Sequence, residues 1–189
     1  MNRPSREEAL ALLRTYTKTE SLLNHARSVE AVMRYCARKR GHDQEKWGVI
    51  GLIHDLDWEM YPTEHCTRTE AILREAGWPE DYIRAAMSHA WEMFTETRPE
   101  HEMEKVLYTI DELTGLVTAT ALMRPSRSVL DMDLKSVKKK WKDKGFAAGV
   151  NRSVIEKGAE MLGIPVDEAI VDTIMGMREA AEDIGLAGN

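Results

Sequence analysis

The sequence predicts an all-α protein that folds as a single compact helical bundle. Apolar residues recur at three- and four-residue spacing along most of the chain, and the alternating pattern typical of strands is rare. The chain has 189 residues, 43% of them hydrophobic and 31% charged. This length supports one core and is too short for two ordinary domains, so we expect a single domain over residues 1–189.

The first two helices have clear start and stop signals. Ser5-Arg6-Glu7-Glu8 has the spacing of a capping box, which predicts that a short helix begins there. A second helix is expected from about 19 to 39, with Gly41 as its stop. Its apolar stripe includes His25, so this imidazole is expected to point inward.

The third helix carries a polar pair at the end of an apolar run. Asp43 caps this helix, which is expected to end near Trp58 and to place His54 on its buried face, beside Asp55. Burying such polar groups without partners costs roughly 2–7 kcal/mol each. A metal ion is one partner that would satisfy them.

Two shorter helices and one long helix add further polar residues to inner faces. Thr63 is predicted to cap a fourth helix with His65 on its inner side. Pro79 is expected as the first residue of a fifth helix, in which His89 joins the apolar side. The sixth helix, from about 102 to 123, is the longest, and Asp111 borders its apolar stripe.

The last third of the chain predicts two or three more helices. A narrow apolar seam runs through the lysine-rich segment 135–144. Asn151 is expected to cap the following helix, and Pro165 to begin the last one.

Polar residues on inner faces form an ordered set. Each histidine alone is more often an ordinary core or surface residue than a ligand, but the set as a whole predicts a metal site. Imidazole and carboxylate groups together suit divalent Mn, Fe, Co, Ni, Zn or Mg, and four imidazoles with two carboxylates are enough for two ions. The predicted ligands are His25, His54, Asp55, His65, His89 and Asp111, whereas His42 and His101 are expected at the surface.

This order of residues resembles the HD-domain superfamily of metal-dependent phosphohydrolases. Its signature is a His, an adjacent His-Asp pair and a distant Asp, and this chain has His25, His54-Asp55 and Asp111. Dinuclear members carry two more histidines before the last Asp, where this chain has His65 and His89. The resemblance covers about 20–125 and leaves 126–189 as a C-terminal helical extension.

The chain also departs from the pattern of the superfamily. Many members continue the pair as His-Asp-Ile-Gly-Lys, whereas this chain reads His54-Asp55-Leu56-Asp57-Trp58. Ala90 follows His89 where cyclic-di-nucleotide phosphodiesterases of the superfamily have a second histidine. The lysine's role and the specificity of those enzymes therefore do not transfer.

The resemblance implies hydrolysis of a phosphate ester or anhydride by a metal-activated hydroxide, with a nucleotide or another small phosphorylated metabolite as substrate. His54 and Asp55 would be central to catalysis. His25, His54, Asp55 and Asp111 would hold one ion, and His65 and His89 would share Asp55 with the second. Asp57, Glu59 and Glu112 would orient ligands or relay a proton, or else be solvated carboxylates at helix ends.

Substrate phosphate would need cations besides the metal ions. Arg124, Lys138 and Lys142 are the first candidates, although most lysines of 135–144 also fit the solvated face of an amphipathic helix. Arg127, Arg27 and Arg68 are further candidates. Near His89, the apolar residues of 91–94 fit either a pocket lid or a homodimer patch.

Charge and hydropathy exclude several classes of partner and location. The net charge of −6 argues against binding to a nucleic-acid polymer, which needs surplus Lys and Arg. No apolar run is long enough for a membrane span, and the first residues lack the apolar segment of a signal peptide, so we expect a cytoplasmic protein. Cys36 and Cys66 are expected to be reduced, with Cys66 only a second-choice ligand.

Two other functions remain open from the sequence. Some HD-like proteins hold two irons with the same six ligand positions and act as oxygenases, here on a small polar substrate. A non-catalytic ligand-binding module could instead retain the cluster for stability.

Overall fold

The computed structural model describes residues 3–143 and 145–188, and in these residues nine α-helices and one short 3₁₀ helix account for the regular structure, without a β-strand. The all-α prediction is confirmed. The elements, in chain order, are α1 (Arg6–Tyr16), α2 (Glu20–Arg40), α3 (Gln44–Ile53), η1 (Pro62–Glu64), α4 (Thr67–Glu75), α5 (Glu80–Ser88), α6 (Glu102–Leu122), α7 (Leu134–Trp141), α8 (Arg152–Leu162) and α9 (Val166–Glu179).

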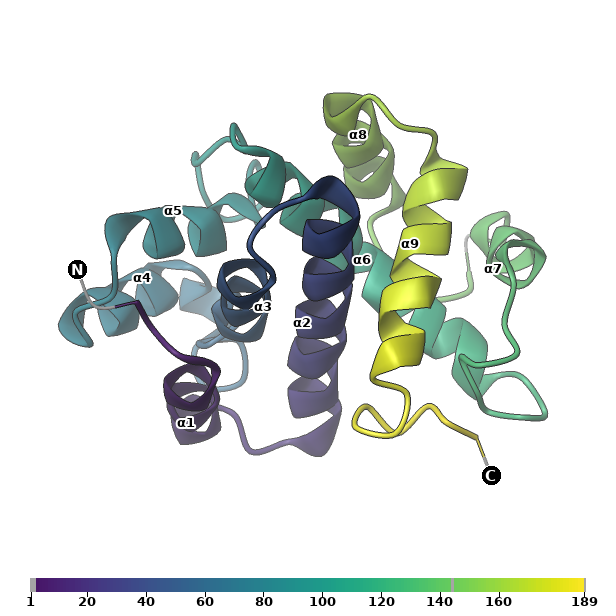
Figure 1. Cartoon of the computed structure of the whole chain (residues 1–189), viewed down its shortest axis with the longest axis horizontal. Helices are drawn as coiled ribbons and strands as arrows, with labels where there is room; N and C mark the ends of the chain where they lie inside the picture. Colours follow the sequence, from purple (N-terminus) through teal and green to yellow (C-terminus); the bar gives the residue numbers. More distant parts are fainter. Residues whose placement is uncertain (1–2, 144, 189) are drawn as a thin grey trace.

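Helix α2 stands at the centre of the bundle, between α3 and α9, and also packs on α6 (Figure 1). Two glycines permit this close packing. A Cβ on Gly51 of α3 would lie 2.9 Å from the Cα of Glu30, and one on Gly176 of α9 would lie 2.6 Å from the Cα of Val32. Because only a residue without a side chain fits at these contacts, α3 and α9 reach the backbone of α2.

The buried apolar side chains form one cluster that extends from Ala9 in α1 to Leu186 after α9. Each large apolar side chain that is fully buried in such a core contributes about 1.5–3 kcal/mol. Within residues 3–143 and 145–188, no helix combines the length and the apolar character that a membrane span requires. The expected cytoplasmic location stays a prediction.

Local capping signals predicted most helix ends well. The capping box of Ser5 and Glu8 is present, and Gly41 ends α2 with a left-handed φ of 74°. The side chains of Asp43 and Asn151 cap α3 and α8 by accepting hydrogen bonds from backbone N–H groups. Pro79 and Pro165 lie one position before their helices rather than inside them.

The prediction for 54–66 was wrong in two respects. Helix α3 ends at Ile53 instead of near Trp58, and Thr63 lies in η1 instead of capping a helix that contains His65. The reason is a tertiary contact: the backbone N–H of Asp57 donates to Thr69 Oγ1, and the Asp57 carboxylate accepts from Thr69 N. These two bonds tie the chain after α3 to the first turn of α4.

Candidate metal centre

Six side chains from five segments converge at one end of α3. They come from the body of α2, the two positions after α3, the bend before α4, the position after α5, and the body of α6. In that order they are His25, His54 and Asp55, His65, His89, and Asp111. Only His25 and Asp111 lie within helices, whereas all four histidines were expected on helix faces.

The first half of this cluster contains two imidazoles and two carboxylates. Asp111 Oδ1 lies 3.0 Å from His25 Nε2 and 3.3 Å from His54 Nε2. Asp55 Oδ2 lies 3.7 Å and 3.4 Å from the same two nitrogens. Four potential ligand atoms therefore surround one point.

The second half uses the other oxygen of Asp55. Asp55 Oδ1 lies 3.5 Å from His65 Nε2 and 3.2 Å from His89 Nε2. These two nitrogens face each other at 3.1 Å. Asp55 is therefore the one member that spans both halves, each of its oxygens facing a pair of imidazoles.

Hydrogen bonds on the outer side of the rings fix how the imidazoles face. The Nδ1 atoms of His54 and His89 donate to the carbonyl oxygens of Gly51 and Ala86, at 2.8 Å and 2.5 Å. Because a carbonyl oxygen can only accept, Nδ1 carries the proton. The Nε2 atom of the neutral ring then has a free lone pair, the form in which imidazole binds metal.

The other two rings are held by side chains. His65 Nδ1 lies 2.7 Å from Asp57 Oδ1. His25 Nδ1 lies 3.3 Å from Thr114 Oγ1, whose own hydroxyl donates to the carbonyl oxygen of Asp111 and is therefore left to accept. All four imidazoles thus direct Nε2 into the cluster.

Backbone strain accompanies the placement of His65. The next residue, Cys66, has φ 69° and ψ −45°, a conformation that side-chain-bearing residues rarely adopt. This turn redirects the chain from η1 into α4 just after His65. The Asp57–Thr69 contact holds the far side of the same turn.

Burial makes the cluster costly without a partner. His54 is fully buried, and its Nε2 atom has no hydrogen-bond partner within the described part of the chain. Burial lowers the pKa of His54, but the carboxylates of Asp55 and Asp111 outweigh it and hold this pKa well above its usual range. Burial raises the pKa of Asp111, but His54 and His25 outweigh it and hold this pKa well below its usual range.

These groups could hold a metal ion. Nitrogen and oxygen atoms from His25, His54 and Asp55, or from His54, His89 and Asp111, lie close enough together to share one. The orphaned Nε2 of His54 and the imidazole-carboxylate donor set both fit a divalent transition metal. Cys66 is also near His65 and His89, but burial raises the pKa of its thiol, which favours the protonated form.

The cluster opens into a pocket of about 240 Å³. Its wall includes Trp58, Met93 and Phe94, and the rings of Trp58 and Phe94 each lie 4.9 Å from the ring of His65. Glu112 also lines the pocket, and burial raises its pKa to about 7. Met93 and Phe94 therefore line the pocket, whereas the lid and the homodimer patch both stay predictions.

The expected substrate cations do not line this pocket. Arg124 binds Asp131 and Ser136 beyond the end of α6, and Lys138 pairs with Asp167. Lys142 is exposed at the end of α7, and Lys144 lies outside the described residues. Arg124 and Lys138 are thus engaged by carboxylates away from the pocket, and Lys142 does not line it, so the structure does not bring these three cations to the cluster.

Some residues that shape the site carried no sequence signal. Thr114 contacts His25, and Gly115 and Gly149 line the pocket, without belonging to any motif. Asp57 was named as a residue that could orient a ligand, and it binds His65. His42 and His101 are exposed, as expected. Comparison of the chain with protein-family models, curated proteins and solved structures found no match.

Proposed function

We propose that this chain is a metal-dependent phosphohydrolase of the HD-domain type, acting on a small phosphorylated metabolite. The observation that carries the proposal is the position of Asp55, whose two oxygens each face a pair of Nε2 atoms. Such an arrangement suits two divalent ions that share one carboxylate. The buried Nε2 of His54 supports the same interpretation, because it makes no hydrogen bond within the described residues although Asp55 and Asp111 oxygens lie near it.

Two ions held there would lower the pKa of a bound water and offset negative charge on the phosphoryl oxygens. The chain itself supplies the geometry. His25 and Asp111 complete the half around His54, and His65 and His89 form the other half. The outer hydrogen bonds keep the rings from turning away, which preserves the positions of the Nε2 atoms.

Charge favours a phosphate monoester over a polyphosphate. Two divalent ions would bring four positive charges, of which Asp55 and Asp111 neutralise two. Two positive charges remain, or one once the bound water has become hydroxide, which is close to what a monoester dianion needs and too little for a polyphosphate. Among the described residues the lining of the pocket contains no Lys or Arg to neutralise further phosphate groups. A nucleoside triphosphate would therefore bring charge that nothing in the pocket offsets.

The pocket wall supports an organic part with an apolar or aromatic face. Trp58 and Phe94 are 38% and 49% exposed, unusually open for large apolar side chains, and both border the cluster. A planar group could pack against them as the phosphate meets the cluster. Glu112 lines the same pocket and could exchange a proton with the leaving group.

The second candidate is a dinuclear-iron oxygenase of the HD type. The same six side chains would hold two irons, and the lack of Lys and Arg in the described lining suits a substrate with little negative charge. Protein that purifies coloured with iron and consumes oxygen with a small polar substrate would favour this candidate. Manganese- or cobalt-stimulated release of inorganic phosphate would favour the hydrolase.

The test is elemental analysis of the purified protein, followed by a phosphate-release screen over monoesters, nucleotides and sugar phosphates with added divalent metals. We expect up to two ions per chain and turnover of a monoester. Asp55→Ala should remove both the metal and the turnover while the circular-dichroism spectrum stays helical. His42→Ala removes an exposed imidazole outside the cluster and should change neither. Full activity in Asp55→Ala would refute the proposal.

The two-ion arrangement has its own test. His65→Ala should leave one ion per chain, because His25, His54 and Asp111 still surround the first half. An unchanged metal content in His65→Ala would exclude a second ion near His65 and His89.

A further inference from the structure

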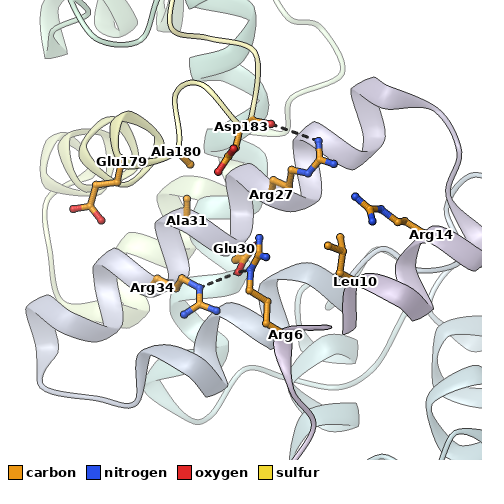
Figure 2. Close-up of a pocket in the computed structure, with 10 residues that line it drawn as sticks. All are labelled: Arg6, Leu10, Arg14, Arg27, Glu30, Ala31, Arg34, Glu179, Ala180 and Asp183. Carbon is orange, nitrogen blue, oxygen red and sulfur yellow. Dashed lines mark hydrogen bonds and ion pairs between the residues drawn. The ribbon is translucent and has the colours of Figure 1, made fainter. Parts of the chain in front are cut away.

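A second pocket, of about 530 Å³, lies between α1, α2 and the segment after α9 (Figure 2). Four arginines contribute to its lining, two from α1 and two from α2. We call it the arginine pocket and define it by Arg6, Arg14, Arg27, Arg34, Glu30 and Asp183. It shares no lining residue with the pocket over the His/Asp cluster.

Glu30 organises the floor of the arginine pocket. Its side chain is only 5% exposed and accepts from Arg6 through both oxygens, at 2.6 Å and 3.0 Å, and from Arg34 Nε at 2.9 Å. A buried carboxylate needs such hydrogen-bond partners. In turn, Glu30 holds side by side two guanidinium groups that would otherwise repel each other. Arg34 also binds both carboxylate oxygens of Glu45 through its two terminal nitrogens. Glu30 and Glu45 therefore balance the charge of Arg6 and Arg34, and the donors that remain for a ligand belong to Arg14 and Arg27.

Two guanidinium groups keep unused donors. Arg27 uses only one terminal nitrogen, which binds Glu20 and Asn24 at 2.9 Å each and the Asp183 carbonyl oxygen at 3.4 Å. Within the described residues its Nε and its other terminal nitrogen have no partner, although the side chain is only 18% exposed. The Arg14 guanidinium likewise pairs with no described residue, and in Figure 2 it extends toward that of Arg27.

These donors suit a tetrahedral anion. Planar guanidinium forks bind phosphate in pairs of hydrogen bonds, and two forks from different helices can contact different oxygens of one phosphate. The pocket is larger than a phosphate ion, and Leu10 and Ala31 add apolar surface to its lining. We propose that the arginine pocket is a second binding site, for a small phosphate monoester, separate from the His/Asp cluster.

Asp183 sets a limit on what binds. It is exposed, lines the same pocket and adds negative charge near Arg6. Glu179 lines the same pocket and pairs with Arg38, so each further phosphate group on a ligand would add repulsion from these carboxylates. Removing the charge of Asp183 should therefore tighten the binding of phosphate.

The test uses inorganic phosphate and phenylphosphonate, a monoester analogue with an unhydrolysable C–P bond, in calorimetric titrations of the full chain at low salt. The titrations are made on the protein as purified and again after metal removal by chelation and dialysis. We expect binding that persists without metal. Arg14→Gln and Arg27→Gln should each weaken it about tenfold, and Asp183→Asn should strengthen it.

Arg74→Gln is the matched control, because it removes the same charge from an exposed arginine that pairs with Glu70 and Glu80 on α4 and α5. It should leave both affinities unchanged. Arg14→Gln keeps the test decisive if Arg27→Gln fails to fold, since Arg14 is exposed and its side chain pairs with no described residue. Metal-free protein that binds neither probe at millimolar concentration, or a folded Arg14→Gln variant with unchanged affinity, would overturn the proposal.

Discussion

The carboxylate of Asp57 binds two parts of the site at once: one oxygen lies 2.7 Å from His65 Nδ1, and the other accepts from the backbone N–H of Thr69 at 2.8 Å. Asp57 is fully buried, and its own N–H donates to Thr69 Oγ1. The Asp57 side chain therefore orients the imidazole of His65 and provides a hydrogen-bond acceptor for a backbone N–H in the first turn of α4.

Asp57→Ala should lower both stability and metal content. Loss of the bonds to His65 and Thr69 should cost about 2 kcal/mol of unfolding free energy in urea denaturation. Metal affinity of the half around His65 should fall about 10–100-fold, because its imidazole is no longer held. Glu64→Ala is the control, because it removes an exposed carboxylate in η1 whose one ion pair among the described residues is with Arg68, and it should cost under about 0.5 kcal/mol. Equal effects of the two variants would contradict this role of Asp57.

Gly51→Ala should destabilise the contact between α2 and α3. The new Cβ would lie 2.9 Å from both the Cα and the N of Glu30, and backbone atoms cannot move aside as a flexible side chain can. Overpacking of this kind costs about 1–3 kcal/mol, which outweighs the roughly 1 kcal/mol gained in helix propensity.

Gly115→Ala in α6 is the comparison for Gly51→Ala. Its Cβ would make an ordinary contact, 3.6 Å from Val150 Cγ2, so the variant should be as stable as the parent or more stable by up to about 1 kcal/mol. Urea unfolding of both variants measures the difference. A Gly51→Ala variant as stable as Gly115→Ala would show that α3 can move away from α2 at little cost.

Metal binding should release a proton and weaken as the pH falls. Asp55 and Asp111 keep the pKa of His54 well above its usual range despite burial, which favours the protonated ring as long as no metal is bound. A metal ion needs the unprotonated Nε2, so it competes with this proton. Calorimetry at one pH in two buffers of different ionisation enthalpy would measure the release; equal heats in both would contradict it.

The same raised pKa has a consequence for the metal-free fold. Because the pKa of His54 is higher in the folded than in the unfolded protein, protonation of His54 stabilises the fold. This contribution is complete below the ordinary histidine pKa and is lost as the pH rises through the pKa of the folded state. The melting temperature of metal-free protein should therefore fall at alkaline pH more than that of metal-loaded protein.

Phe94→Ala should impair substrate binding without removing metal. Phe94 borders the pocket, and its ring lies 4.9 Å from the ring of His65. The Phe94 side chain has no atom that could bind a metal ion. KM for an aromatic monoester should rise about tenfold, which corresponds to roughly one aromatic contact, while metal content stays unchanged. Met123→Ala, which removes an exposed apolar side chain at the end of α6, should leave KM unchanged. A loss of bound metal in Phe94→Ala would instead show that this ring helps to hold the metal ligands in place.

The sequence by itself determined the helices and the order of the polar side chains that meet. Caps such as those of Ser5 and Asp43, and the stop at Gly41, depend on groups within a few residues, so local chemistry decides them. The helical period likewise placed His25 and Asp111 on inner sides of long helices, where the structure has them close together.

Only the tertiary structure decided where His65 lies and which charges reach the pocket. The bend that carries His65 depends on Asp57 meeting Thr69, and Arg124 and Lys138 are engaged by carboxylates that local periodicity does not locate. The arginine pocket also brings α1, α2 and the end of the chain together. Such contacts join residues from different helices or from the loops between them, so the period within one helix does not predict them, and their free energy exists only once the chain has packed.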